Sequence, residues 1–268
     1  MIIIGEKING SIPSVAKAIA EKNADFIRNL AKVQSAAGAS YIDVCASVKD
    51  HIEIETMKWL IDQVQEVTDT PIAVDSPNTR VCVECMQFCN KPGLLNSVSL
   101  EGDKIDVAFP VLSLNPEWEV VALLNDDNGI PQTAERRLEV FEGIMKKAKE
   151  FGIDSSRIHI DPLVEMLCTS DDGIAMVVKV INEIKAQYPS IHITGAVSNI
   201  SFNLPVRKLV NQGFIVLAMN AGMDSAILDP LNRDMMGMIF ATEALLGKDD
   251  YCMEYICAYR EEIFGSKK

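Results

Sequence analysis

Acidic and amide side chains recur along this chain where apolar runs end, at intervals that match one strand followed by one helix. Between 21 and 38 residues separate successive members of the set. The positions are Glu6, Asp43, Asp75, Asn96, Asn125, Asp161, Asn199 and Asp229. Taken singly, Asp and Asn are common at strand ends because they cap helices and stabilise turns. Taken together, at the spacing of one strand and one helix, they predict one polar site.

Four members of this set directly follow strongly apolar runs: Asp75, Asn96, Asp161 and Asn199. Carboxylates accept hydrogen bonds from N–H and NH2 groups, whereas an amide both donates and accepts in one plane. No basic cluster accompanies them. The set therefore suits a neutral or amine-bearing heterocycle, such as one with a guanidine-like ring edge, better than a phosphate or a carboxylic acid.

A divalent cation is the competing ligand, because Asp, Glu and Asn oxygens at the mouths of barrels often hold Mg2+. Such a site should combine two acids on neighbouring strands with a Lys or His base. His159 and His192 instead fall inside apolar runs, where a histidine is more often packed in the core. We therefore expect no bound metal.

The elements that would position these residues are short β-branched runs that alternate with amphipathic stretches along the whole chain. This pattern is typical of a parallel sheet built from strand–helix units. The predicted strands cover residues 1–5, 41–45, 71–75, 94–99, 119–124, 158–163, 192–198 and 224–228. Eight such units in about 250 residues indicate an α/β fold of the (β/α)8 TIM barrel type, with its chemistry at the C-terminal mouth.

A single domain over residues 1–268 is expected, because no low-complexity or Pro/Gly/Ser-rich boundary interrupts the chain. A doubly wound open sheet is the structural alternative. Its first strand–helix turn would be residues 5–10, which read GEKING and match neither the GxGxxG dinucleotide turn nor the GxxxxGK(S/T) phosphate loop. The barrel is therefore preferred.

The composition argues against several classes of protein. The 268 residues are 48% hydrophobic and carry a net charge of −13, which disfavours broad binding to nucleic acid or anionic lipid. No apolar run is long enough for a membrane span, and residues 1–5 lack the features of a signal peptide, so we expect a cytoplasmic protein. The seven cysteines are expected to be free thiols, with Cys82, Cys85 and Cys89 on the core-facing side of a helix.

Several short motifs, taken in order, resemble the pterin-binding methyltransferases that exchange a methyl group between methyltetrahydrofolate and a corrinoid protein. They extend over almost the whole chain, and although each alone is weak, the ordered set is specific. The similar segments, each followed by the family's form, are 5–10 (GERING), 42–45 (LDxN), 74–76 (LDS), 96–97 (NS), 129–131 (GIP), 160–163 (IDPL) and 198–201 (SNVS).

The resemblance implies a (β/α)8 barrel that forms a homodimer and holds a pterin at its C-terminal mouth. By this resemblance Asp75, Asn96 and Asp161 would bind the 2-amino-4-oxo edge of the pterin, with Asp43 in the same pocket. Methyltetrahydrofolate or tetrahydrofolate would be the substrate. A corrinoid (cobalamin) would arrive on a separate partner protein, because one barrel takes up the length of the chain.

The resemblance also assigns residues to the reacting end of the substrate. Asn199 would hydrogen-bond N5, the nitrogen that carries the methyl group, and Arg207 would meet a carboxylate of the folate tail. Cobalt and N5 are the reacting atoms, so the protein needs no nucleophile and must align them. This sequence departs from the family at Cys45, where Asn is frequent, and at Phe202, where some members are polar.

Two other functions stay open at this point: a condensing enzyme similar to dihydropteroate synthase, and a folate-binding subunit without catalysis. The synthases resemble this chain in their pterin pocket, but they are recognised by basic residues for a diphosphate and by a terminal RxH element. Residues 227–230 read ILDP instead. An enzyme differs from a folate-binding subunit in the role of Asn199. In an enzyme Asn199 would act mainly in the transition state, so its loss would lower the rate far more than the affinity for folate.

The last part of the chain carries Tyr251, Tyr255 and Tyr259 at a four-residue step. This spacing predicts a terminal helix over residues 240–259. Its aromatic face would serve either the interface of a homodimer or the closure of the barrel wall.

Overall fold

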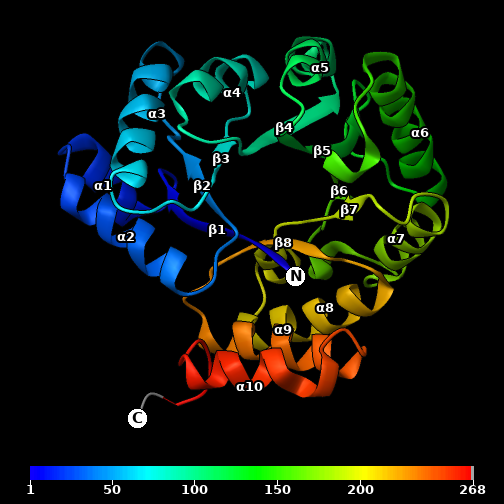
Figure 1. Cartoon of the computed structure of the whole chain (residues 1–268). Helices are drawn as coiled ribbons and strands as arrows, with labels where there is room; N and C mark the ends of the chain where they lie inside the picture. Colours follow the sequence, from blue (N-terminus) through cyan, green and yellow to red (C-terminus); the bar gives the residue numbers. More distant parts are fainter. Residues whose placement is uncertain (267–268) are drawn as a thin grey trace.

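Eight parallel strands form a nearly closed barrel in the computed structural model, which describes residues 1–266 (Figure 1). The strands are β1 (Ile2–Asn9), β2 (Tyr41–Cys45), β3 (Ile72–Asp75), β4 (Leu94–Leu100), β5 (Glu119–Asp126), β6 (Ile158–Asp161), β7 (His192–Ile193) and β8 (Ser225–Leu228). Their hydrogen-bonded order is β7-β6-β5-β4-β3-β2-β1-β8. The predicted (β/α)8 barrel is confirmed, and the open doubly wound sheet is wrong.

Helices surround the barrel and connect successive strands (Figure 1). They are α1 (Pro13–Ala20), α2 (Ala24–Ala36), α3 (Asp50–Gln65), α4 (Thr79–Cys85), α5 (Lys104–Leu114), α6 (Ala134–Phe151), α7 (Ala175–Gln187), α8 (Arg207–Ala221), α9 (Arg233–Leu245) and α10 (Met253–Arg260). Short 3-10 helices include η3 (Leu167–Thr169) and η4 (Val197–Ser201). None of the helices within residues 1–266 is long and apolar enough to cross a membrane.

The bounds of α6 show how local sequence sets these elements. The Thr133 hydroxyl accepts a hydrogen bond from the backbone N–H of Arg136 at 3.2 Å and caps the first turn. Gly152 follows the last turn with a left-handed φ of 69°, a conformation that glycine adopts without steric cost. Both ends of the helix are therefore specified by single residues.

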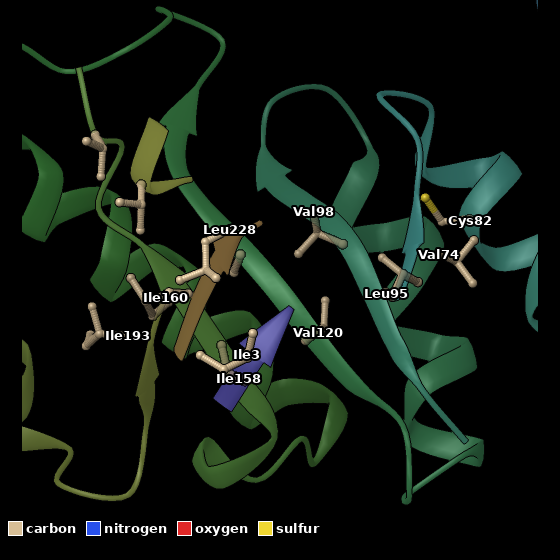
Figure 2. Close-up of a cluster of buried hydrophobic side chains, with 14 of the residues drawn as sticks. Ile3, Val74, Cys82, Leu95, Val98, Val120, Ile158, Ile160, Ile193 and Leu228 are labelled. Atoms are coloured by element: carbon tan, nitrogen blue, oxygen red, sulfur yellow. The ribbon is translucent and has the colours of Figure 1, made fainter. Parts of the chain in front are cut away.

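Alternate residues of β1, β3, β4 and β5 belong to two separate apolar cores, because successive side chains point to opposite faces. Ile3 points outward and belongs to the large cluster between the strands and the helices (Figure 2). Ile4, Ala73, Leu94 and Val121 point inward and fill the barrel. The residues two positions further along β3 and β4 then open onto the C-terminal mouth, above this apolar layer.

A polar layer fills the barrel towards its N-terminal end. His159 is fully buried, with Nε2 2.8 Å from Glu119 Oε2 and Nδ1 3.0 Å from Ser225 Oγ. The Tyr41 hydroxyl donates to the same Glu119 oxygen at 2.9 Å. Burial lowers the pKa of His159, which favours the neutral ring. The prediction that His159 is a packed core residue is confirmed.

The barrel closes between β7 and β8 with few backbone hydrogen bonds. Ala196 and Ile227 form a single isolated bridge there. The carboxylate of Asp224 supplies further links across the same gap: Oδ1 accepts from the Ile193 backbone N–H at 2.8 Å, and Oδ2 accepts from Lys185 Nζ at 2.8 Å. A side chain therefore replaces part of the missing strand ladder.

Replacing Asp224 by alanine should destabilise the protein by about 2 to 4 kcal/mol, because the buried Ile193 N–H loses its partner and the half-buried Lys185 loses its counter-charge. Although burial opposes the shift, hydrogen bonds from His192 and Lys185 lower the pKa of Asp224 to about 2. The carboxylate therefore contributes its full stabilisation above about pH 4 and loses it as the pH falls towards 2. Thermal unfolding at neutral and acidic pH measures both effects.

The control for this prediction is Asp234→Ala, which removes an exposed carboxylate that also pairs with a lysine, Lys208. Exposed ion pairs contribute little, so we expect a change below about 1 kcal/mol. Equal unfolding temperatures for Asp224→Ala and Asp234→Ala would show that the Asp224 carboxylate does not hold the barrel closed.

The predicted strand over residues 192–198 is wrong beyond Ile193. Thr194 still donates its backbone N–H to Ile160 O at 2.8 Å, but the chain then turns into η4. The neighbouring strand β6 is followed by Pro162, which has no N–H to continue the ladder. Asn199 consequently lies within a 3-10 turn and not at the tip of a strand.

The predicted single helix over residues 240–259 is also wrong, because α9 and α10 are separate. Gly247 has a φ of 70° and follows the end of α9. The carboxylate of Asp249 accepts backbone hydrogen bonds from Glu254 and Tyr255, both at 2.9 Å, and so caps the start of α10. Tyr251 lies in the break and is exposed.

Candidate functional site

Three of the predicted site residues meet on neighbouring strands at the C-terminal mouth. Asp75 of β3 pairs in register with Asn96 of β4, so their side chains lie side by side. Asn96 Nδ2 donates to Asp43 Oδ1 at 3.1 Å, which brings β2 into the group. Asp43 is 2% exposed and Asn96 is 8% exposed. Two carboxyl groups and one amide therefore form a polar cluster, which we call the acid–amide cluster; Asp43 and Asn96 are buried in it and Asp75 is half-buried.

Burial and mutual repulsion change the protonation of this cluster. Burial raises the pKa of Asp75 to about 6, and burial together with the charge of Asp75 raises the pKa of Asp43 well above its ordinary value. Two adjacent buried carboxyl groups cannot both ionise without a large electrostatic cost. The pair therefore tends to share one proton, which the raised pKa of Asp43 favours on that group, and Asp75, with a pKa of about 6, is ionised near neutral pH.

Asp161 ends β6 at the same mouth of the barrel. The side chain is buried, and Oδ1 accepts a hydrogen bond from the Leu163 backbone N–H at 2.7 Å. Burial raises the pKa of Asp161 to about 6, and the positive charge of Arg137 opposes that rise. At neutral pH Asp161 is therefore a second buried, ionised hydrogen-bond acceptor.

A buried glutamate in α3 supports the ends of β3 and β4. The Ser76 hydroxyl donates to Glu53 Oε1 at 2.7 Å, and the Ser76 backbone N–H donates to Asn96 O at 3.0 Å. Cys82 Sγ lies 3.5 Å from the carbonyl oxygens of Ser76 and Asn96. Sequence analysis missed Glu53; the available signal was its four-residue spacing from Met57, which places it on the buried face of the helix.

The turn η4 carries Asn199, which is half-buried. Arg207 braces this turn: Nε donates to Ser201 Oγ at 3.0 Å, and Nη2 donates to Ser198 O at 2.8 Å. The guanidinium also lies over the ring of Phe202, 4.6 Å from its centroid. Phe202 thus serves as a platform for Arg207, whereas a contact between Arg207 and a substrate carboxylate stays a prediction.

The other acidic and amide residues of the predicted set have different surroundings. Glu6 does not end a strand, since β1 continues to Asn9, and burial together with Asp229 raises the pKa of Glu6. Asp229 Oδ2 lies 3.0 Å from Lys7 Nζ. Asn125 Oδ1 is buried without a hydrogen-bond partner in the part of the chain that the structure describes.

One cysteine lies at the mouth, and three others are predicted to face the core. Burial raises the pKa of the Cys45 thiol well above its ordinary value, and its Sγ lies 3.3 Å from Ser47 Oγ, so a neutral thiol occupies the position where asparagine is frequent. Cys82 and Cys85 of α4 are buried, which confirms that they face the core, whereas the half-buried Cys89 lies beyond the end of that helix and the prediction is wrong there. Across residues 1–266, no group of three or more His, Cys, Asp or Glu side chains is placed to hold a metal ion.

Sequence comparisons connect this chain to known enzymes. A family model described as "Pterin binding enzyme" matches residues 6–229. A methylcorrinoid:tetrahydrofolate methyltransferase of Eubacterium limosum is 50% identical over 266 residues, which cover 99% of this chain and 98% of that protein. A methionine synthase of Mycobacterium leprae is 30% identical over 251 residues, which cover 87% of this chain but only 21% of that protein.

Structural comparisons find dihydropteroate synthases. The Yersinia pestis enzyme with a pterine-sulfa conjugate has a TM-score of 0.66 at 13% identity and covers 92% of this chain and 93% of its own. A dihydropteroate synthetase with "Product1" has a TM-score of 0.67 at 14% identity and covers 93% of this chain and 94% of its own. At such low identity the likeness shows a shared fold alone.

Proposed function

Because the chain belongs to the pterin binding enzymes, and within them to the methyltetrahydrofolate:corrinoid methyltransferases, we propose that it moves a methyl group from a separate corrinoid protein to N5 of tetrahydrofolate. The direction follows the name of the Eubacterium limosum relative, which gives methylcorrinoid first and tetrahydrofolate second. The observation that carries the proposal is the acid–amide cluster, with buried Asp161 at the same mouth.

The acid–amide cluster suits the 2-amino-4-oxo edge of a pterin. That edge offers N–H donors at N3 and at the 2-amino group, and the ionised carboxylates of half-buried Asp75 and buried Asp161 are acceptors for them. Charge-assisted hydrogen bonds of this kind are about twice as strong as neutral ones. Asp43 accepts a hydrogen bond from Asn96, which orients the amide so that its second N–H is available to the ligand.

The methyl transfer is an in-line displacement between two substrate atoms. The N5 lone pair of tetrahydrofolate forms a bond to the methyl carbon, and the electron pair of the breaking carbon–cobalt bond stays on cobalt. N5 then releases its proton to solvent. The protein supplies no nucleophile, so its contribution is to hold N5 in line with the incoming methyl group.

Asn199 is the residue that we assign to N5. As N5 attacks, positive charge develops on it, and the Asn199 amide oxygen would accept the N5–H hydrogen bond and stabilise that charge. An amide is too weak a base to remove the proton itself, so solvent takes it. Arg207 holds the turn that carries Asn199 and would direct its free N–H groups to a carboxylate of the folate tail.

Exposed apolar side chains surround the mouth, where the corrinoid protein must bring its cobalt. They come from the loops after β5 and β7 and from the start of α8, and they are Ile130, Phe202, Val206 and Leu209. Val206 is 68% exposed. Its backbone is also left-handed, a conformation that is unusual for a β-branched residue. We propose that this rim contacts the corrinoid protein during transfer.

Replacing Val206 by glutamate is expected to raise the KM for the methylated corrinoid protein roughly tenfold or more, because a charge would be desolvated at the contact. The rate with free methylcobalamin should stay within about twofold, since no protein surface has to dock. The measurement is chromatography of the methyltetrahydrofolate formed. The matched control is Leu245→Glu, at the opposite end of the barrel and 85% exposed. It should change neither the KM for the corrinoid protein nor the rate with free methylcobalamin.

We also propose that two copies associate through α10. Tyr255 and Tyr259 leave part of their rings exposed there, beside the exposed Met253. Such a face is typical of interfaces, which are enriched in Tyr and Met. Sedimentation would give twice the chain mass of 29.5 kDa for this proposal and the single mass against it.

A further inference from the structure

One arginine is buried completely between two loops of the mouth. Arg137, in α6, is 0% exposed. Its Nε donates to Pro131 O at 3.0 Å, and its Nη1 donates to both Pro162 O and Leu163 O, the latter at 2.7 Å. Its Nη2 forms an ion pair with Glu165. Arg137 thus ties the loop after β5 to the loop after β6.

The backbone that Arg137 contacts is strained, and it directly follows the predicted site residue Asp161. Leu163 has a φ of 65°, which a non-glycine residue keeps only where its surroundings impose it. In this conformation its N–H donates to Asp161 Oδ1 at 2.7 Å, and its carbonyl accepts from Arg137 at 2.7 Å. Because Pro162 has no N–H, Leu163 is the first backbone donor after Asp161. The direction of the Asp161 carboxylate therefore depends on a peptide that Arg137 fixes.

The same loop reaches the turn that carries Asn199. Beyond Glu165 the chain forms η3, where Cys168 Sγ lies 3.5 Å from Phe202 O. Met166 Sδ lies 3.7 Å from Asn203 Nδ2. Phe202 directly follows η4, so the loop that begins at the Arg137 contacts ends against the second half of the site.

We propose that Arg137 is a positioning residue of this enzyme, which sets the direction of the Asp161 carboxylate and the path of the loop towards Asn199 without touching substrate. This inference rests on the proposed role of Asp161 in pterin binding. A guanidinium is required because its planar fork of five N–H donors serves several carbonyls at once, whereas a lysine ammonium on a flexible stem does not.

A purely structural role is the alternative, because loss of a buried arginine with several partners also destabilises a protein. The two roles differ in the pH dependence of substrate binding. Arg137 is the charged side chain that acts on Asp161 and opposes the rise of its pKa. Removal of that charge should raise the pKa of Asp161 further and shift the acidic limb of tetrahydrofolate affinity to higher pH. Loss of stability alone would leave this limb in place.

Calorimetric titration with tetrahydrofolate between about pH 5 and pH 8 tests the proposal. For R137Q we expect an affinity roughly tenfold lower at the alkaline end, where misplacement alone acts, and an acidic limb displaced to higher pH. For R137K we expect a similar loss with the limb unchanged, because the charge is kept. The matched control is R136Q, which removes the neighbouring, more exposed arginine and should change neither quantity.

Wild-type affinity in R137K or R137Q would overturn the proposal, and so would a loss of affinity in R137Q with the wild-type acidic limb. If R137Q does not fold, R137K decides: a folded variant with roughly tenfold lower affinity supports positioning, and wild-type affinity contradicts it. D161N separates this inference from the proposed function. If D161N binds tetrahydrofolate normally, the assignment of Asp161 itself fails; if only D161N loses binding, the role of Arg137 fails.

Discussion

Asp161→Asn is expected to raise the Kd for tetrahydrofolate roughly 100-fold at pH 7. The carboxylate is buried and would accept hydrogen bonds from the pterin edge, and each charge-assisted bond of this kind contributes about 1.5 to 3 kcal/mol. Asparagine keeps the shape but replaces one acceptor oxygen with an NH2 group, which would face the N–H donors of the ligand. Isothermal titration calorimetry measures the change.

The affinity of the unmodified protein should also depend on pH in a defined direction. Burial raises the pKa values of Asp75 and Asp161 to about 6, so both carboxylates are ionised at pH 7 and become protonated as the pH falls. Tetrahydrofolate affinity should therefore decrease below about pH 6.

The control for Asp161→Asn is Asp171→Asn, which changes an exposed carboxylate on the loop after β6. Unchanged affinity in Asp161→Asn would remove the pterin edge from this part of the site.

Asn199→Ala is expected to lower kcat roughly 100-fold while the Kd for tetrahydrofolate changes less than about threefold. The reason is that the hydrogen bond to N5 strengthens as positive charge develops during attack, and interactions stronger in the transition state act on the rate. Single-turnover methyl transfer gives the rate, and calorimetry gives the affinity.

The control for Asn199 is Asn203→Gly, which removes an amide from the adjoining loop and keeps the left-handed backbone that Asn203 adopts. Equal losses of rate and affinity in Asn199→Ala would point to a folate-binding subunit in which turnover is incidental. A loss confined to the rate supports a catalytic role for this amide.

The fold was predictable because apolar residues are spaced differently in strands and in helices, and the two patterns alternate along the chain. Eight β-branched runs at nearly regular spacing left few alternatives to a barrel, and the strand starts at Tyr41, Leu94 and Glu119 agree with the structure. The predicted bounds are wrong where the local composition favours one structure and a neighbouring segment of the fold prevents it. The run after His192 has the composition of a strand, but Pro162 on the neighbouring chain segment ends the ladder.

The adjacency of Asp75 and Asn96 was predictable, whereas the residues that support them were not. Asp75 and Asn96 follow apolar runs that had to be adjacent strands, and register then places them side by side. Arg137 contacts Pro162, which is 25 residues away in sequence, and Glu53 contacts Ser76 across 23 residues. The partners in such pairs cannot be found from sequence periodicity, although the spacing of Glu53 from Met57 signals that this glutamate is on a buried helix face.

The most direct test of the proposed activity follows the methyl group itself. The protein is mixed with tetrahydrofolate and a corrinoid protein whose cobalt carries a carbon-13 methyl group, and the label is followed by nuclear magnetic resonance. We expect the label to move to N5 of tetrahydrofolate while the cobalt spectrum changes to that of the demethylated, reduced corrinoid, and Asp161→Asn should slow both changes when tetrahydrofolate is subsaturating. A label that stays on cobalt in the presence of the unmodified protein would contradict the account.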